Sequence, residues 1–458
     1  MSTRKTELRT LAEFAAGFRL EEAPKDAVHA AEACVLDTIG AALGAAGLSE
    51  TGKLCRAVAA FGKGGRHQAV VWGYNGTLNL NEAVFLNAMM GHSLEFDDVH
   101  AESKSHIGTV VIPAAWGCAE ALLKDGKCFL EAVIIGYEVM GRIGVAMDVA
   151  SNRTRGWHTT GITGTFGAAA AAGKLMGLSA EQMVSALGMA GTQSSGLWAF
   201  LEDGASCKKL HPARAAVNGV AAAILAKGGM TGPEHILDAG DGGLFRAVTD
   251  CFDLERLTKG LGTDYAVLCM DKKPYPCCRT THPAIDAALR LRNEADASEI
   301  ARIEVETYAV GVLQCGTEKY PENGEQARFS IPYTVAAALT RGRVTQEEFS
   351  RKTLMEGGIR RLAENTIVKE AKEFSELYPE RWGSRMTLFL KDGRKKSCRI
   401  DDMSGSVRNP LSEKQETDKF TGLAAKVFDE ETCGELEKTL RDIRSQSRMP
   451  ALFGKGIL

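Results

Sequence analysis

The chain has 458 residues, of which 45% are hydrophobic and 25% charged, and its formal net charge is −3. This composition is ordinary for a soluble globular protein, so disordered and fibrous classes are excluded. The acidic balance also argues against nucleic acid as a partner, because nucleic-acid binders are generally basic.

Cysteine usage and the N-terminal sequence indicate where the protein works. The twelve cysteines are scattered singly, apart from Cys277 and Cys278, and show none of the paired spacings of zinc or iron–sulfur sites. The first residues are charged and helical in pattern, without the apolar core of a signal peptide. We therefore expect a cytoplasmic protein with reduced thiols and no membrane partner.

The first half of the chain has mainly helical patterns. Apolar residues recur at helical spacing from Thr10 to Ala46, which predicts two packed helices, with Pro24 in the first turn of the second. Residues 68–80 instead predict a short hairpin with an Asn75–Gly76 turn. Helices rich in alanine and glycine then continue to about Gly229, which indicates close helix packing.

The composition changes after about residue 264. The patterns predict a strand at 265–270, a helix at 283–293, a strand at 299–310 and a hairpin at 385–400 around Asp392–Gly393. From Ser412 the pattern is helical again. We therefore predict a mainly α protein with an α+β second domain: residues 1–264 form a large helical domain, 265–405 an α+β lid, and 406–458 helices that return to the helical domain.

The stretch from Gly156 to Gly167 is the least ordinary part of the sequence. Its glycines at 161, 164 and 167 would share one face of a helix beginning near Thr160. The free N–H groups of such a helix start can bind an anion, and His158, just upstream, can transfer a proton. The alternatives are that the glycines serve only close packing and that His158 is a buried structural residue.

Cations and histidines gather in four acid-free segments, 104–119, 149–180, 204–233 and 272–285. If these segments meet in space, an acidic protein acquires one cationic cavity that can hold a small polycarboxylate. The alternative is that these side chains are solvated surface. The residues concerned are Lys104, Arg153, Arg155, Lys208, Lys209, His211, Arg214, Lys272, Lys273, Arg279 and His282.

Chemistry on such a substrate begins at the carbon next to a carboxylate. Removal of that proton needs a base tuned towards neutrality, which is either His158 or a lysine crowded by cations, such as Lys208 beside Lys209. A second acid then decides the outcome. Protonation of a leaving hydroxyl gives dehydration, whereas return of a proton to carbon gives epimerisation.

A metal site is the competing interpretation. Glu95, Asp97 and Asp98 lie beside His100 and His106, and such ligands can hold zinc, iron or manganese in a metal-dependent hydrolase. Carboxylates that orient a histidine or lysine are commoner, and no H-E-x-x-H, GxGxxG or P-loop motif is present. We therefore expect neither a metal nor a cofactor.

Six motifs occur in an order that covers nearly the whole chain. They are HSLEFDDVH (92–100), SHIG (105–108), GWHTTGITGTFGAAAAAGKLMGL (156–178), LEDGASCKKLHPARAA (201–216), KPYPCCRTTHPAID (273–286) and ARFSIPYTVAAAL (327–339). Together they resemble the MmgE/PrpD family, which includes 2-methylcitrate dehydratase, cis-aconitate decarboxylase and iminodisuccinate epimerase. The resemblance implies a helical domain built from both chain ends, a smaller α+β lid, a homodimer, and a metal-free and cofactor-free site between the domains.

The matching motifs also imply site residues. We expect His158, Lys208, His106 and Asp97 to be catalytic. We expect the substrate to be bound by Lys273, Glu95, Lys209, Arg279, His282 and Tyr275.

Four differences argue against decarboxylation. Where decarboxylase-like members have Asp, Thr and a further lid His, this chain has Glu95, Val99 and Cys278, and SHIG replaces a His-Pro segment. The favoured activity is a 2-methylcitrate dehydratase-like lyase. Epimerisation of a dicarboxylate such as iminodisuccinate is the nearest alternative, followed by decarboxylation of cis-aconitate.

Overall fold

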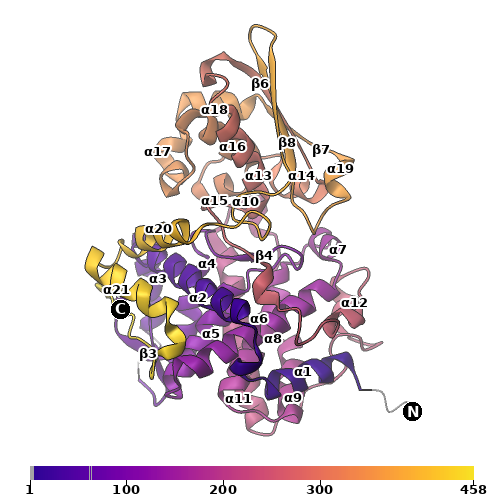
Figure 1. Cartoon of the computed structure of the whole chain (residues 1–458), viewed down its shortest axis with the longest axis vertical. Helices are drawn as coiled ribbons and strands as arrows, with labels where there is room; N and C mark the ends of the chain where they lie inside the picture. The colour runs from indigo at the N-terminus through magenta and orange to yellow at the C-terminus, as the bar shows by residue number, and fades with distance from the viewer. Residues whose placement is uncertain (1–4, 61, 63) are drawn as a thin grey trace.

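The computed structural model describes residues 5–60, 62 and 64–458. It shows a mainly helical protein with a smaller sheet-containing region, arranged as two lobes, one standing on the other (Figure 1). We call the larger lobe, with elements α1–α9, α11, α12, α20 and α21, the helical body, and the smaller, with α13–α19 and β6–β9, the sheet lobe. Helix α10 (Phe200–Asp203) lies beside α15 and packs into the core of the sheet lobe (Figure 1). Each lobe has its own hydrophobic core.

The helical body is built around α8 (Thr159–Leu175), which packs against α5, α6, α9 and α11. Its start agrees with the predicted helix near Thr160. The other body helices before the sheet lobe are α1 Glu7–Gly17, α2 Lys25–Ala46, α3 Ser49–Ala59, α4 Leu80–His92, α5 Gly108–Ala121, α6 Gly126–Ala146, α7 Val149–Thr154, α9 Ala180–Gly191, α11 Leu210–Lys227 and α12 Leu244–Val248.

The glycines of α8 allow this close packing. A Cβ added at Gly164 would lie 2.9 Å from Ala215 Cβ, and one added at Gly167 would lie 2.7 Å from Met140 Cβ and 2.9 Å from the Gly136 carbonyl oxygen. A backbone carbonyl cannot swing aside, so position 167 needs glycine, and at position 164 the side chains of Ala215 and Val110 leave little room for a Cβ. The packing interpretation of the glycine spacing is confirmed.

We expect Gly167→Ala to lower the free energy of unfolding by about 1–3 kcal/mol, the usual cost of overpacking a core. Urea unfolding measures it. The matched control is Gly17→Ala at the exposed end of α1, where an added Cβ meets nothing within 4 Å and alanine favours the helix. Equal stabilities of the two variants would contradict this account.

Helix α2 is long and apolar enough to cross a membrane by length and composition alone. In this structure 83% of its most apolar window is buried, and α2 packs against α4 and α20. A buried core helix passes the same test, so this helix is weak evidence for a membrane span.

The sheet lobe contains one four-stranded sheet in the order β7-β6-β8-β9. Strand β6 pairs in parallel with β7 and antiparallel with β8, and β8 pairs antiparallel with β9. The strands are β6 Ile300–Thr307, β7 Thr366–Glu370, β8 Ser384–Leu390 and β9 Lys395–Ile400; the helices are α13 His282–Leu291, α14 Ala309–Cys315, α15 Gly324–Arg328, α16 Ile331–Arg341, α17 Arg351–Leu354, α18 Gly357–Glu364 and α19 Lys372–Ser375.

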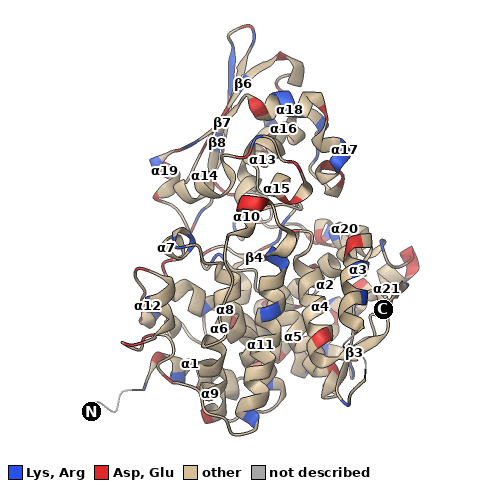
Figure 2. Ribbon diagram, turned by 180° about the vertical axis from the view of Figure 1, so that it is seen from behind, with Lys and Arg blue, Asp and Glu red and all other residues tan. Residues whose placement is uncertain are grey.

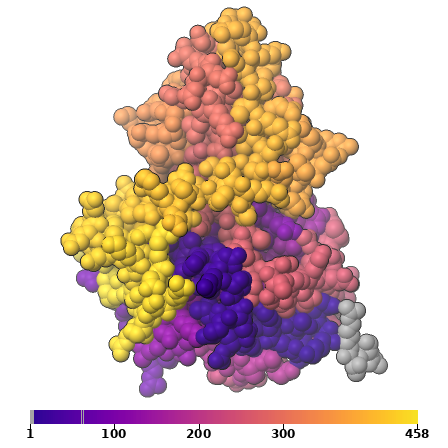
Figure 3. Space-filling model, viewed as in Figure 1, coloured from indigo at the N-terminus to yellow at the C-terminus, as the bar shows by residue number. Residues whose placement is uncertain are grey.

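The last helices return to the body. Helix α20 (Glu413–Ala424) and α21 (Glu430–Arg441) pack on α2, and Phe420 belongs to the body core. Figure 3 shows this C-terminal segment beside the N-terminal helices on one face. The domain boundaries predicted after residues 264 and 405 stay a prediction.

Several predicted elements are confirmed, including the two N-terminal helices, β6, α13 and the β8–β9 hairpin, where Gly393 has φ +87°. The predicted strand at 265–270 is wrong, because residues 266–269 form a 3-10 turn before the short strand β5 (Met270–Asp271), which pairs with β4 (Val99–His100). The early hairpin exists as β1 (Gln68–Val70) and β3 (Thr77–Asn79). Its turn is longer than predicted, because β2 (Tyr74–Asn75) pairs instead with β10 (Gly456–Ile457).

Candidate active site

A buried carboxylate joins two lysines at the junction of the lobes. Glu95 follows α4 with φ +53°, which turns the chain sharply, and its side chain forms an ion pair with Lys208. Lys273 Nζ donates to the Glu95 carbonyl at 2.9 Å and lies 3.4 Å from Glu95 Oε2. Burial opposes ionisation of Glu95, but the nearby Lys208, His92 and Lys273 hold its pKa well below the ordinary value. Burial likewise disfavours the charged form of Lys273, but Glu95 and Asp97 raise its pKa.

Asp97 orients two histidines. Its Oδ2 accepts from His92 Nδ1 at 2.7 Å and lies 3.2 Å from His106 Nδ1, which also donates to the Asp98 carbonyl at 3.0 Å. With protons assigned to both Nδ1 atoms, each Nε2 keeps its lone pair. Burial lowers the pKa of His106 to about 4 despite Asp97, so this imidazole is neutral at neutral pH.

His158 is the N-cap residue of α8 and is only 2% exposed. Its Nδ1 lies 2.9 Å from Nδ1 of His211, so one of these atoms donates and the other accepts. Burial, together with Lys208 and His211, holds the pKa of His158 well below the ordinary value. With the proton assigned to His158 Nδ1, which then donates to His211, Nε2 keeps its lone pair and the neutral imidazole can act as a base.

These groups surround a small cavity with walls from both lobes. It is lined by Val99, Lys104, His106, His158, Trp198, Lys208, Cys278, Arg279, Thr280, Gln314, Phe329 and Trp382. Its volume of about 20 Å³ suits a water molecule but not a small acid. Binding of such an acid therefore requires the lining side chains or the lobes to move.

The structure does not bring every predicted site residue to this cavity. Arg279 lines it, but Arg279 is also paired with Asp271 at 3.1 Å. His282 is fully buried behind Arg279, at 2.9 Å from its Nη1, and Tyr275 donates to Asp286. Lys209 is half-buried and does not line the cavity, and the fully buried Lys273 does not line it either. Substrate contact is therefore not supported for His282, Tyr275, Lys209 and Lys273.

The role expected for Glu95 also changes. Its carboxylate is an anion that two lysines already bind, so it cannot attract a second carboxylate. It is better described as the group that positions Lys208 and Lys273.

Two of the residues in the competing metal interpretation, Asp98 and His100, have other partners. Asp98 accepts from Tyr137 at 2.7 Å and from Gly108 N at 3.0 Å, and His100 bonds to Ser103. A different set is close together: the ligand atoms of His92, His106 and His158 lie within 4.8 Å of one another. These three imidazoles could hold a divalent cation, although the nearby ammonium groups of Lys208 and Lys273 oppose its charge.

Cys278 was not predicted as a site residue. It lines the cavity and accepts from Gln314 Nε2 at 3.0 Å. Burial raises the pKa of its thiol, but a hydrogen bond with Cys315 and the cations Lys208 and Lys273 lower it to about 6. Its place in the KPYPCCRTTHPAID motif was the available signal. No sequence signal marked Trp198 and Phe329 as cavity residues, because apolar residues that line a cavity have the same sequence pattern as core residues.

We expect Asp98→Asn to change how stability depends on pH. Burial and the neighbouring Asp37 raise the pKa of Asp98 to about 7, so the folded protein favours the neutral acid. The contribution of the neutral Asp98 to the free energy of unfolding is complete below the pKa that this carboxyl has in the unfolded chain, and it is lost as pH rises through 7. Asparagine is always neutral, so the stability of the variant relative to the unmodified protein should rise by about 2–3 kcal/mol from pH 5 to pH 8. Urea unfolding at both pH values measures it, and a constant difference would contradict the assignment.

Comparison with known proteins matches both parts of the chain. Residues 9–257 match the family model described as MmgE/PrpD N-terminal domain, and residues 275–443 match MmgE/PrpD C-terminal domain. Relatives include a cis-aconitate decarboxylase of Aspergillus terreus, 26% identical over 93% of this chain and 90% of the relative. A cis-aconitate decarboxylase of Homo sapiens is 28% identical over 89% of this chain and 86% of the relative. A mitochondrial 2-methylcitrate dehydratase of Yarrowia lipolytica is 24% identical over 70% of this chain and 63% of the relative.

Proposed function

The chain belongs to the MmgE/PrpD family, and on that basis we propose that it is a lyase that removes a proton next to a carboxylate of a small di- or tricarboxylic acid. The observation that carries this proposal is the gathering of His158, Lys208 and His106 around one cavity. The favoured reaction is dehydration of a 2-methylcitrate-like acid, without a cofactor.

The geometry supports a simple sequence of steps. The neutral His158 takes the proton from carbon, and the ammonium group of Lys208 stabilises the negative charge that develops on the carboxylate. Glu95 holds both lysines in place. The β-hydroxyl then leaves as water with a proton donated by Lys208, which gives an alkene.

Epimerisation is the second candidate because of Cys278. This thiol lines the cavity from the sheet lobe, whereas His158 lines it from the helical body. One group can remove a proton from carbon while the other returns one. Decarboxylation remains a third candidate because several relatives carry that activity in their names. It is the less favoured because Val99 and Cys278, two of the differences from decarboxylase-like sequences, line the cavity.

Incubation with a panel of polycarboxylates in heavy water separates the candidates. A rising alkene absorbance indicates dehydration, release of carbon dioxide indicates decarboxylation, and deuterium incorporation without a new absorbance indicates epimerisation. If no acid in a panel containing citrate, 2-methylcitrate, cis-aconitate and iminodisuccinate reacts, the proposal is wrong. Loss of turnover on addition of a chelator would instead support a metal-dependent enzyme.

We also propose a cytoplasmic homodimer. The twelve cysteines are all free thiols, as expected in a reducing compartment. Helix α11 and the turn after it expose apolar side chains, with Ile224 and Leu225 each 45% and Met230 56% exposed. Light scattering should give twice the chain mass, and Ile224→Asp with Leu225→Asp should give the mass of one chain.

A further inference from the structure

We propose that Lys104, which lines the active-site cavity, and Arg153, which stacks on the cavity residue Trp198, form a second carboxylate-binding subsite. The proposal deepens the proposed function, on which it rests for the substrate class. It assigns the substrate a second carboxylate, remote from the one that Lys208 contacts.

The charges of the other cations at the cavity, and of Lys273 buried behind it, are already balanced. Lys208 and Lys273 face the carboxylates of Glu95 and Asp97, and Arg279 faces Asp271. The two lysines and the two carboxylates together have no net charge, and the ion pair of Arg279 with Asp271 has none either. The positive charge that a polycarboxylate needs must therefore come from elsewhere.

Lys104 supplies one such charge. It is 9% exposed, lines the cavity, and its Nζ has no hydrogen-bond partner among the described residues. Its backbone has φ +53°, which an L residue adopts only at a cost. The ammonium lies 5.9 Å from the ring centroids of both Trp198 and Tyr378. The aromatic rings hold the side chain at the cavity but do not use its hydrogen-bond donors.

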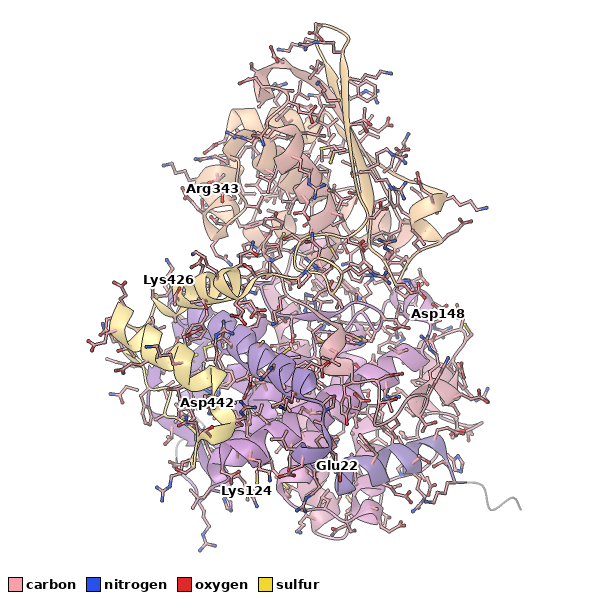
Figure 4. The ribbon with its side chains drawn as sticks, in the orientation of Figure 1. Glu22, Lys124, Asp148, Arg343, Lys426 and Asp442 are labelled. Carbon is pink, nitrogen blue, oxygen red and sulfur yellow. The ribbon has the colours of Figure 1, made fainter. Side chains whose placement is uncertain are left out.

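Arg153 supplies the other charge. It is also 9% exposed, and its guanidinium carbon lies 4.3 Å from the Trp198 ring centroid. Its Nε has no partner, and no ion pair of Arg153 is found among residues 5–60, 62 and 64–458. The side chain comes from α7, whose N-cap is Asp148, with a carboxylate that accepts from Ala150 N and Ser151 N. Asp148 lies at the edge of the helical body near the lobe junction (Figure 4), and α7 occupies the same junction in Figure 2.

Two buried cations around one indole ring are unfavourable without an anion. Buried charges are normally paired, because the free-energy cost of removing an unpaired charge from water is not offset by other interactions. The cost is evident in the pKa of Lys104. Burial and the nearby charge of Arg153 lower this pKa to about 7, and Lys208 lowers it further, whereas Cys278 and Cys315 raise it. A Cys278 thiolate offsets at most one of the two charges. A bound carboxylate would accept from Lys104 Nζ and Arg153 Nε and would remove the repulsion.

The test compares Lys104→Met and Arg153→Met with unmodified protein and with Lys209→Met, a neighbouring lysine outside the cavity. The probes are propane-1,2,3-tricarboxylate and glutarate, which lacks the central carboxylate, measured by calorimetry at pH 8 in two buffers of different ionisation enthalpy. Each of the first two variants should weaken tricarboxylate binding by about 10- to 100-fold and Lys209→Met should not. Proton uptake on binding should disappear in Lys104→Met alone.

A second readout separates binding from a merely structural role. Removing an unpaired buried cation should raise the melting temperature of the ligand-free protein while reducing the ligand-induced shift. A lower melting temperature with unchanged tricarboxylate affinity would overturn the subsite. The proposed function is judged separately by turnover, because Lys208→Met should reduce turnover by about 100- to 1,000-fold whether or not Lys104 and Arg153 bind the ligand.

Discussion

Lys208→Met should reduce turnover by about 100- to 1,000-fold, the usual effect of removing one group that stabilises charge in a transition state. It should also lower the free energy of unfolding by about 3 kcal/mol, because it leaves the Glu95 carboxylate buried with one partner fewer. Steady-state kinetics and urea unfolding measure the two effects.

A double variant separates these effects. Lys208→Met with Glu95→Gln removes both charges of the pair, so most of the lost stability should return while turnover stays low. Lys209→Met serves as the control for a neighbouring lysine that makes no ion pair among the described residues. Normal turnover in Lys208→Met would remove Lys208 from the mechanism.

His158→Gln should reduce kcat by about 100- to 10,000-fold, which is the range for loss of a general base, with little change in melting temperature. Exchange of the substrate C–H proton with heavy water should fall by the same factor. Because the pKa of His158 lies well below its ordinary value, the neutral base persists under acid conditions. The acidic limb of the unmodified enzyme's pH–rate profile should therefore lie below pH 6.5.

His211→Leu tests whether His158 is positioned by its neighbour. It removes the only hydrogen-bonding side chain recorded on His158 within the described chain, so kcat should fall less than in His158→Gln and KM should change little. Unaltered exchange in His158→Gln, with loss of exchange in Cys278→Ser, would instead transfer the role of base to the thiol.

The helices of the body were predictable because their signals are local. The apolar spacing of residues 10–46 and the glycine spacing of α8 each describe a face that must be buried, whatever covers it. The segment 265–270 failed because its apolar run follows no period, and a 3-10 turn accommodates it as well as a strand.

The sequence by itself determined which residue types were available to the site: its six motifs identified the family and named Glu95, Asp97, His106, His158, Lys208 and Lys273. Only the tertiary structure decided their pairing. Lys208 and Lys273 meet Glu95 across 113 and 178 residues, and Tyr275 and His282 turn away from the cavity. It also decided that Lys104 and Arg153 stay unpaired. Whether a charge is neutralised depends on its neighbours and burial in space, and neither is encoded by the local spacing of residues.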